Sequence, residues 1–229
     1  MFVDLRFMDY SEALDLQLKT VSLKIEKKDF RDIIFFVEHP LVFTLGKQGG
    51  RENLSVSEQF LHQKNIRVIQ TGRGGNITCH CPGQAVMYPV VDLEKNRIGV
   101  KDFVFGLEEI MKQTALDFGI MADRDTRNHG IWVENCKIGS VGLCIKKAIS
   151  FHGIAMNINP DLTPFSWINP CGLSNIAMTS LENEMKKTGS ELPCPSVQAV
   201  KKNFITHFTS IFDYEITQVL NENEFKNFL

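Results

Sequence analysis

No stretch of this sequence is apolar for long enough to cross a membrane. The longest apolar runs, such as residues 33–37, fall far short of the roughly 20 residues that a spanning helix needs. Residues 1–7 carry neither the charged leader and apolar core of a secretory signal nor an arginine-rich transit helix. These absences predict a cytoplasmic protein with no membrane association.

An excess of charge of one sign is also missing. The 25 Lys and Arg residues nearly balance the 27 Asp and Glu residues, which gives a net charge of -2. A chain without an overall basic field is not drawn to nucleic acid or to an anionic membrane, so we expect neither as a partner. A local basic patch remains compatible with an acidic protein partner.

Cysteines are too few for a scaffold built on disulfides. Six in 229 residues fit free thiols in a reducing compartment better than a disulfide framework. The sequence also lacks internal repeats, low-complexity tracts and linkers rich in Pro or Ser. Because 43% of the residues are hydrophobic, the chain has room for a sizeable core, and we expect one domain over residues 1–229.

Helical and strand-like patterns occupy separate blocks of the chain. The clearest helix spans residues 100–118, where apolar residues recur on one helical face. Further helices are expected where Ser11 caps a helix with Leu14, Leu18 and Val21 inward, and after Ser196. Strands are expected at 32–37, 41–45, 66–70 and 84–91, and as several short strands within 130–159. This pattern predicts an α+β (mixed α/β) fold in which helices pack on mixed β-sheets.

A glycine-rich segment runs from Arg73 to Gln84. Its small residues let a ligand approach backbone amides, while Arg73 and His80 supply donors at the edges. Such a loop suits a polar head group, for instance an acyl carbonyl with a thioester or carboxylate attached. A plain glycine turn, with its arginine paired to a carboxylate, fits the pattern equally well. The spacing matches neither the phosphate loop nor the dinucleotide fingerprint, so we expect no nucleotide.

Cys79, His80 and Cys81 resemble a set of zinc ligands only at first sight. Successive residues of a strand point to opposite faces, which would separate His80 from the two thiols. No second cluster of paired ligands occurs in the sequence. We therefore expect no metal site.

Lys137 and Cys171 are the candidate reactive pair. A thiol with an ordinary pKa of about 8.5 is mostly protonated at neutral pH, so a nucleophilic cysteine needs a nearby cation such as Lys137. Pro170 would stiffen the approach to Cys171, and Gly172 would leave the next backbone amide accessible to an oxyanion. A buried structural cysteine and a solvated lysine remain equally compatible with these residues alone.

Taken in chain order, these segments resemble the lipoyl(octanoyl) transferase family. The resemblance extends over residues 38–173. The motifs that carry it are Glu38-His39-Pro40, Thr44-Leu45-Gly46, Arg73 to Gln84, Tyr88-Pro89, Asp92-Leu93, Lys137 to Gly142, His152-Gly153, Asn157 and Pro170-Cys171-Gly172.

The resemblance implies a fold like that of biotin and lipoate protein ligases, and an acyl transfer that needs no ATP, metal or other cofactor. Cys171 would take octanoyl from octanoyl-acyl carrier protein as a thioester, with Lys137 lowering the pKa of its thiol. The acceptors would be lysines on the lipoyl domains of 2-oxoacid dehydrogenases and on glycine cleavage H protein. The implied substrate-binding residues are Arg73, Gly74, Gly75, Asn76, Ile77, Thr78, Cys79, His80, Ser140, Val141, Gly142, Gly153, Ile154 and Ala155. We expect a monomer, because no coiled-coil repeat is present.

Three positions depart from the family pattern. Cys79 stands where an aromatic residue is usual, Cys81 where glycine is usual, and Lys47 where arginine is usual. The added bulk at Cys81 predicts a reshaped loop or acyl pocket.

Three other functions stay open. An ATP-dependent lipoate or biotin protein ligase would survive the loss of Cys171, and a non-catalytic acyl-carrier or lipoyl-domain binding module would form no covalent adduct. An amidotransferase would use the same cysteine chemistry with an already modified protein as its donor.

Overall fold

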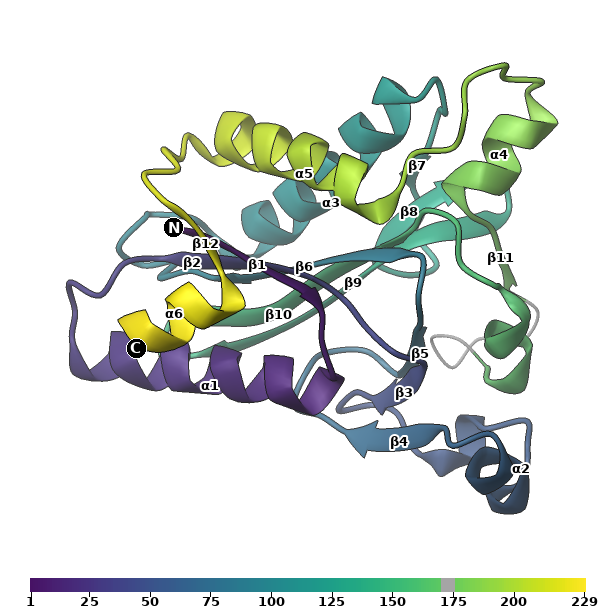
Figure 1. Ribbon diagram of the computed structural model, residues 1–229, viewed down its shortest axis with the longest axis horizontal. Helices are drawn as coiled ribbons and strands as arrows, with labels where there is room; N and C mark the ends of the chain where they lie inside the picture. Colours follow the sequence, from purple (N-terminus) through teal and green to yellow (C-terminus); the bar gives the residue numbers. More distant parts are fainter. Residues whose placement is uncertain (170–175) are drawn as a thin grey trace.

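A computed structural model describes residues 1–169 and 176–229. Within these residues two β-sheets are present, a nine-stranded sheet and a three-stranded sheet, with helices around them (Figure 1). The large sheet has the order β12-β1-β2-β6-β10-β9-β8-β7, with β11 paired to β9. The mixed α/β class expected from the sequence is therefore confirmed.

The element bounds are as follows. The large sheet contains β1 (Phe2–Phe7), β2 (Ile33–Glu38), β6 (Gln84–Val90), β7 (Asp123–Arg124), β8 (Gly130–Val133), β9 (Cys136–Lys146), β10 (Ile149–Asn157), β11 (Ala177–Met178) and β12 (Val219–Asn221). The small sheet contains β3 (Val42–Leu45), β4 (Arg67–Gln70) and β5 (Ile77–His80). The α-helices are α1 (Tyr10–Glu26), α2 (Glu58–Gln63), α3 (Val100–Asp117), α4 (Leu181–Lys187), α5 (Val197–Phe212) and α6 (Glu222–Phe228), and the 3-10 turns are η1 (Arg51–Asn53) and η2 (Thr163–Trp167).

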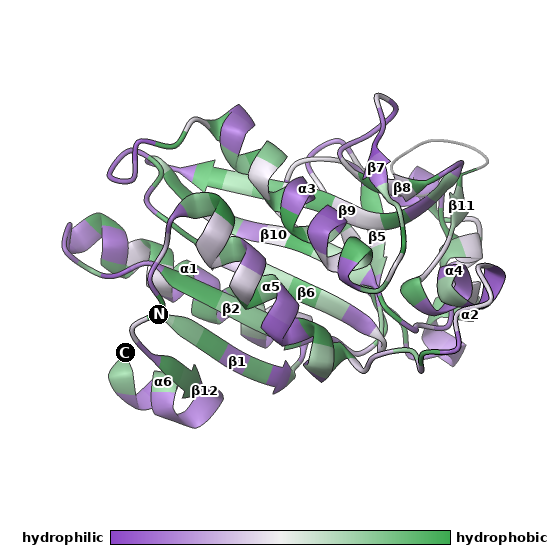
Figure 2. Cartoon of the chain, turned by 90° about the horizontal axis from the view of Figure 1, so that it is seen from above, coloured by the Kyte–Doolittle hydropathy of each residue, from purple (hydrophilic) through white to green (hydrophobic). Residues whose placement is uncertain are grey.

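Helices cover both faces of the large sheet, α3 and α5 on one side and α1 and α6 on the other (Figure 1). Along β2, Ile34 and Phe36 join the core under α3 and α5, whereas Phe35 and Val37 join the core on the α1 side. A strand buried on both faces needs a continuous apolar run, which β2 provides. Figure 2 shows the same apolar character in the central strands.

The helices expected at 100–118 and after Ser196 are confirmed as α3 and α5. Ser196 caps α5, since its hydroxyl accepts a hydrogen bond from the backbone N–H of Ala199 at 3.1 Å. The two helices approach closely at Gly106. A Cβ at that position would lie 2.4 Å from the ring of Phe212, so a larger residue there would have to displace this ring.

The expected cap and inner face of α1 are partly wrong. Asp9 is the N-cap, and its carboxylate accepts a hydrogen bond from the N–H of Ser11 at 2.8 Å. Leu18 is 40% exposed, while Gln17 is fully buried. Gln17 faces inward because its amide oxygen accepts a hydrogen bond from the backbone N–H of His152.

Several short strands were expected within 130–159, but most of this region forms one long hairpin. β9 and β10 contain 11 and 9 residues, and they are joined by Lys147 and Ala148. Both connecting residues have positive φ, at 49° and 63°. Tight hairpin turns favour this backbone, but glycine and asparagine usually supply it, so residues 147 and 148 do not indicate a turn by their type.

The small sheet lies beside the large one and holds the glycine-rich segment against it. β3 pairs in parallel with β4 and antiparallel with β5. Between β4 and β5 the chain returns to the large sheet, where the N–H of Gly74 donates to the carbonyl of Leu143 on β9 at 2.7 Å. A pocket between the two sheets is the result.

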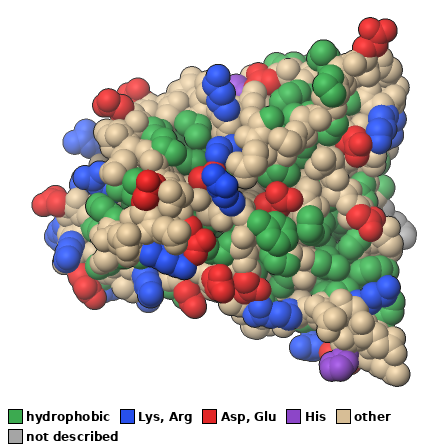
Figure 3. Space-filling view, viewed as in Figure 1, with side chains coloured by type: hydrophobic (Ala, Val, Ile, Leu, Met, Phe, Trp, Pro, Cys, Tyr) green, Lys and Arg blue, Asp and Glu red, His purple; other side chains and the backbone are tan. Residues whose placement is uncertain are grey.

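The surface shows no dominant charge. On the face seen in Figure 3, side chains of both signs are interspersed with apolar ones, as the small net charge leads one to expect. In the part of the chain that the structure describes, none of the helices has the length and apolarity of a membrane span.

Asp32 joins several distant segments at the start of β2. Its carboxylate pairs with Lys24 at 2.6 Å and accepts hydrogen bonds from the N–H of Asp92, the amide of Asn96 and the hydroxyl of Tyr214. Burial alone would raise the pKa of Asp32, yet Lys24 and these hydrogen bonds hold it below its ordinary value of 3.8.

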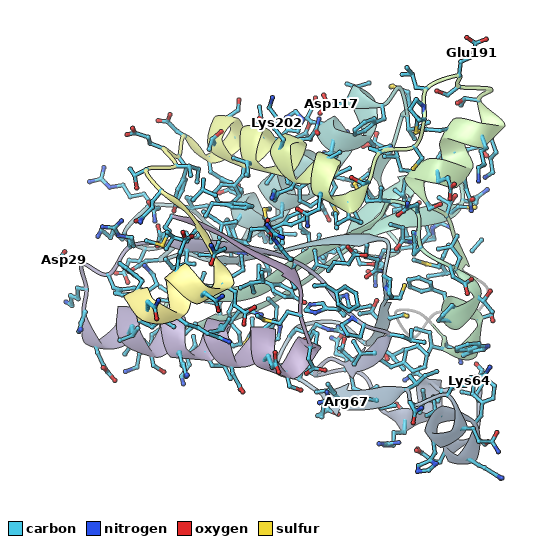
Figure 4. All side chains as sticks on the ribbon, in the orientation of Figure 1. Asp29, Lys64, Arg67, Asp117, Glu191 and Lys202 are labelled. Atoms are coloured by element: carbon cyan, nitrogen blue, oxygen red, sulfur yellow. The ribbon has the colours of Figure 1, made fainter. Side chains whose placement is uncertain are left out.

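We expect Asp32→Asn to lower the free energy of unfolding by about 3 kcal/mol, because it leaves a buried lysine without its counter-ion. The carboxylate stabilises the fold above its ordinary pKa and loses this effect as the pH falls through the lowered pKa, so the difference between parent and variant should shrink in acid. Urea unfolding at several pH values measures both effects. Asp29→Asn is the control, since Asp29 is exposed in the same loop (Figure 4). Equal stability of the two variants at neutral pH would contradict the prediction.

Candidate active site

A narrow pocket with a cavity volume of about 50 Å³ opens between the two sheets. Its walls come from β5 and the loop before it, from the facing stretches of β9 and β10, and from the start of α1. The lining residues are Tyr10, Arg73, Gly75, Asn76, Ile77, Thr78, His80, Tyr88, Asn128, Lys137, Ser140, Val141, Gly142, His152, Gly153, Ile154 and Ala155.

Most residues that the family resemblance implied as a site line this pocket. Of the implied substrate-binding residues, two lie elsewhere. Gly74 lines a wider outer groove that shares Gly75, Val141 and Gly142 with the pocket. Cys79 is on the other face of β5, in the core of the small sheet. The expected nucleophile, Cys171, lies outside the described residues.

Arg73 fixes the glycine-rich loop to the small sheet. Its guanidinium is only 7% exposed and donates to the carbonyl of Thr44 at 2.6 Å, to the Thr44 hydroxyl and to the carbonyl of Gly74. Gly75 follows with φ of +80°, a backbone that glycine adopts without strain. At Gly46, a Cβ would lie 2.2 Å from the carbonyl oxygen of Gly75, so close contact of the two loops requires glycine there. These contacts place the loop at the mouth of the pocket.

Gly142 and Gly153 pair directly across β9 and β10. A Cβ on Gly142 would lie 3.1 Å from Cδ of Arg73, and one on Gly153 would lie 2.1 Å from the carbonyl oxygen of Met87. Side chains at this pair would therefore displace Arg73 or β6. The two glycines keep one wall of the pocket flat.

Lys137 is the chemically most unusual residue of the pocket, because it is fully buried. Its Nζ donates to Oδ1 of Asn128 and to the carbonyl oxygen of His129, each at 2.8 Å. It also lies 5.4 Å from the ring centroid of Trp132. Burying an amine is costly unless acceptors replace water, and the loop at 128–129 supplies two of them. The amine is thus held at a fixed place in the pocket wall.

The inner part of the pocket is ringed by aromatic residues with polar tips. Tyr10 stacks on His80 with ring centroids 5.6 Å apart, and its hydroxyl lies 3.4 Å from Nδ1 of His152. Behind them, His39 donates from Nδ1 to a backbone carbonyl and accepts a hydrogen bond at Nε2 from the hydroxyl of Tyr88 at 2.9 Å. His152 has φ of 57°, so its side chain leaves the regular alternation of β10.

These aromatic groups are held neutral. Burial lowers the pKa of His39 to about 4 and that of His152 to about 3, and it brings the pKa of His80 well below the ordinary value. The positive charge of Arg73 adds to the shifts of His80 and His152. Burial also raises the pKa of Tyr10 to about 12. At neutral pH the inner pocket therefore offers neutral hydrogen-bonding groups.

No metal ligand set forms around the glycine-rich loop. Cys79 and Cys81 lie in the core of the small sheet, whereas His80 lies on the other side of β5, where its ring stacks on that of Tyr10. Throughout residues 1–169 and 176–229, no three His, Cys, Asp or Glu side chains come close enough to bind a metal ion. Cys81 lies outside the pocket and has no positive φ, so its bulk does not narrow the pocket.

Sequence reasoning did not assign Tyr10, Tyr88, Asn128 and His152 to the site. Tyr88 and His152 stood in recognised motifs, which was a usable signal. Tyr10 and Asn128 reach the pocket only through the packing of α1 and of the loop before β8, and the local sequence carries no sign of either.

The arrangement suits acyl-group chemistry. Glycine-loop amides at the mouth can approach a carbonyl, apolar side chains such as Ile77, Val141 and Ile154 can contact an alkyl chain, and an amine is fixed in the wall. Nothing in the described pocket resembles a phosphate loop.

Comparison with known proteins agrees with this geometry. The family described as the lipoyl protein ligase A/B catalytic domain matches residues 9–209. The octanoyltransferase of Desulfotalea psychrophila is 46% identical over 184 residues, which is 80% of this chain and 82% of that protein.

Solved structures share the fold at low sequence identity. Lipoate-protein ligase A bound with ATP superposes with a TM-score of 0.71 at 14% identity, covering 98% of this chain and 90% of that one. Biotin protein ligase from Leishmania major in complex with biotin gives a TM-score of 0.53 at 12% identity, covering 93% and 73%. The expected likeness to the biotin and lipoate protein ligase fold is confirmed.

Because the buried histidines are neutral, we expect the free energy of unfolding to fall in mild acid. A buried histidine with a lowered pKa takes up its proton only on unfolding. Each such histidine therefore lowers the free energy of unfolding by up to about 1.4 kcal/mol per pH unit below about pH 6.5. We expect His152→Asn, which tolerates the positive φ, to remove about 2 kcal/mol of the stability lost between about pH 6.5 and about pH 4.5. Urea unfolding across this range measures the slope. The matched control is His62→Asn, an exposed histidine on α2; an unchanged slope in His152→Asn would refute a neutral His152.

Proposed function

This chain belongs to the lipoyl protein ligase A/B catalytic-domain family, and we propose that it is an octanoyltransferase of protein lipoylation that works through Cys171 and Lys137. The single observation that best supports the mechanism is the buried Lys137, whose amine is held by Asn128 and His129 in the wall of the pocket. The donor we propose is octanoyl-acyl carrier protein. The acceptors are lysines on lipoyl domains of 2-oxoacid dehydrogenases and on glycine cleavage H protein.

In the first half-reaction the Cys171 thiolate attacks the thioester carbonyl of the donor. A bond forms between sulfur and the acyl carbon, and the bond to the carrier thiol breaks after a tetrahedral oxyanion has formed. Backbone amides at the pocket mouth are suited to donate to that oxyanion. The charge of Lys137 lowers the pKa of the Cys171 thiol, which raises the thiolate fraction at neutral pH.

In the second half-reaction the neutral amine of the acceptor lysine attacks the Cys171 thioester. An amide bond forms, the thiolate of Cys171 leaves, and the attacking nitrogen loses a proton. In our proposal Lys137 gives its proton to the departing carrier thiolate in the first half-reaction, so it is neutral at this stage and accepts the proton of the attacking nitrogen. Its fixed position between two oxygen acceptors suits this role.

The pocket offers the alkyl chain a limited selectivity. Ile77, Val141, Ile154 and Ala155 supply its apolar contacts. Each methylene buried there adds about 0.8 kcal/mol, so hexanoyl and decanoyl donors should react as well, only less efficiently.

The setting we propose is the cytoplasm, with residues 1–229 acting as one catalytic domain and the protein working as a monomer. Cys79, Cys81, Cys136, Cys144 and Cys194 are free thiols, which suits a reducing compartment.

Incubation with octanoyl-acyl carrier protein should leave one octanoyl group on Cys171. A thioester is cleaved by hydroxylamine whereas an amide is not, so peptide mass spectrometry with and without hydroxylamine identifies the bond. We expect the adduct in the parent and in Cys194→Ala, where a half-buried cysteine of the loop before α5 is removed. The same treatment of Cys171→Ala should give no adduct. A fully active Cys171→Ala variant would reject the thioester mechanism.

Replacing the buried amine should slow acylation while the donor still binds. Because general acid–base groups contribute about 100-fold or more, we expect Lys137→Met to lower kcat at least about 100-fold with little change in KM for the donor. The pKa of Cys171, read from the pH dependence of its alkylation by iodoacetamide, should rise. Lys146→Met, at an exposed position further along β9, is the control. Parent-like turnover in Lys137→Met would remove Lys137 from the mechanism.

A further inference from the structure

One peptide group separates Lys137 from a buried carboxylate that the proposed mechanism does not use. The carbonyl oxygen of His129 accepts the hydrogen bond from Nζ of Lys137 at 2.8 Å. The N–H of the same peptide group belongs to Gly130, and it donates to Oε1 of Glu108 at 2.9 Å. The chain of contacts therefore runs from amine through one peptide plane to carboxylate.

Glu108 is built into this place by several contacts. It lies on α3, which packs against β8 and β9, and is 5% exposed (Figure 1). Besides the N–H of Gly130, its Oε1 lies 3.3 Å from Nδ1 of His129, and its Oε2 accepts from Nε of Arg124 at 3.1 Å. Donors thus converge on both oxygens, an arrangement that a carboxylate satisfies and a carboxamide cannot, since one side of an amide is itself a donor.

Position 130 has no space for a side chain. Its φ is +129°, and a Cβ there would lie 2.1 Å from the carbonyl oxygen of Gly139 and 2.9 Å from Cε of Lys137. The His129–Gly130 peptide group, whose carbonyl accepts from Lys137, is therefore in close contact with the lysine, and its N–H donates to Glu108. Rotation of this plane would turn the His129 carbonyl away from the amine.

We propose that Glu108 is a positioning residue for the octanoyl transfer reaction, acting on Lys137 through the His129–Gly130 peptide group. Its carboxylate fixes the direction of the His129 carbonyl. By accepting the N–H, it also polarises that peptide and makes the carbonyl oxygen a better acceptor for Nζ. This inference rests on the proposed function of Lys137.

Other charges near Lys137 do not take this role. Hydrogen bonds from Arg127 and, to a smaller extent, the charge of Lys137 lower the pKa of Asp125. However, Asp125 is partly exposed and is paired with Arg127 at 2.7 Å. The Arg127 guanidinium lies 4.2 Å from the ring centroid of Trp132 and pairs with Asp125 rather than with a group that contacts Lys137. Glu108 is joined to the amine through a continuous path of hydrogen bonds.

Glu109 provides a matched control on the next position of α3. Its Oε2 accepts from Nη2 of Arg124 at 2.7 Å, so both glutamates pair with the same arginine. Only Glu108 also contacts the peptide that holds Lys137. A loss of helix stability or of the ion pair would affect both variants, whereas a loss of positioning would affect Glu108→Gln alone.

The test compares Glu108→Gln, Glu109→Gln and Arg124→Gln in steady-state octanoyl transfer from octanoyl-acyl carrier protein to a lipoyl domain. A misplacement of about 1 Å in a catalytic group can cost about 100-fold in rate, so we expect Glu108→Gln to lower kcat by about 10- to 100-fold with little change in KM for the donor. Glu109→Gln and Arg124→Gln should leave kcat close to that of the parent. Thermal unfolding identifies any variant that is not folded at the assay temperature.

A second readout follows Lys137 without any acyl substrate. The pH dependence of Cys171 alkylation should shift upward in Glu108→Gln, in the same direction as in Lys137→Met, and should not shift in Glu109→Gln. Equal effects of Glu108→Gln and Arg124→Gln, in rate and in alkylation, would overturn the proposal and leave Glu108 as a stabilising ion pair. If Lys137→Met itself matched the parent, the proposed function of Lys137 would fail instead, so the two failures are distinguishable.

Discussion

The site depends on the burial of Lys137. A lysine amine without access to water must be given acceptors by the protein, and each acceptor must itself be held in place. Asn128 and the His129 carbonyl meet this demand, and the loop that carries them is tight enough to require glycine at position 130. The register shift between Ile131 and Trp132, where β8 pairs with β9, lies directly beside this loop. One amine therefore constrains two strands and their connection.

A second buried cation, Arg73, does the same for the opposite wall. Its hydrogen bonds to Thr44 and Gly74 join the glycine-rich loop to the small sheet, while Gly142 lets that loop lie close to the large sheet. Both walls are thus fixed by basic side chains that donate to neutral oxygens. The space between them is surrounded by uncharged aromatic groups. Such a pocket suits a thioester and its alkyl chain, which carry no charge.

Local pattern was enough to predict most of the fold. The apolar run of β2, the one-sided helix α3 and the Ser196 cap of α5 are properties of short segments, and each was found in the structure as expected. Features that depend on distant partners were not predictable. Asp9 rather than Ser11 caps α1, and the side chains of both residues accept hydrogen bonds from Arg67 on β4. Gln17 is buried where Leu18 was expected, because its amide oxygen accepts from the N–H of His152. The hairpin turn at Lys147 and Ala148 uses positive φ without glycine.

The pocket shows the same division. Its glycine-rich and Lys137 motifs were assigned to the site through the family resemblance, whereas the residues alone fitted a plain glycine turn and a solvated lysine equally well. Tyr10 and Asn128 were not, because they come from a helix start and a loop whose positions only the packed structure defines. Glu108 is a third case: on α3 it looks like any helical glutamate, and its contact with the Gly130 peptide becomes evident only when α3 is packed on β8.

In the proposed reaction, octanoyl moves from a thioester to a lysine without activation by ATP. The most direct test of this transfer mixes the purified protein with octanoyl-acyl carrier protein and an unmodified lipoyl domain, with a chelator and no nucleotide, and follows the intact mass of the domain. We expect one octanoyl group on the domain, joined by a bond that resists hydroxylamine. Modification that occurs only from free octanoate with ATP and magnesium would contradict it and identify a ligase.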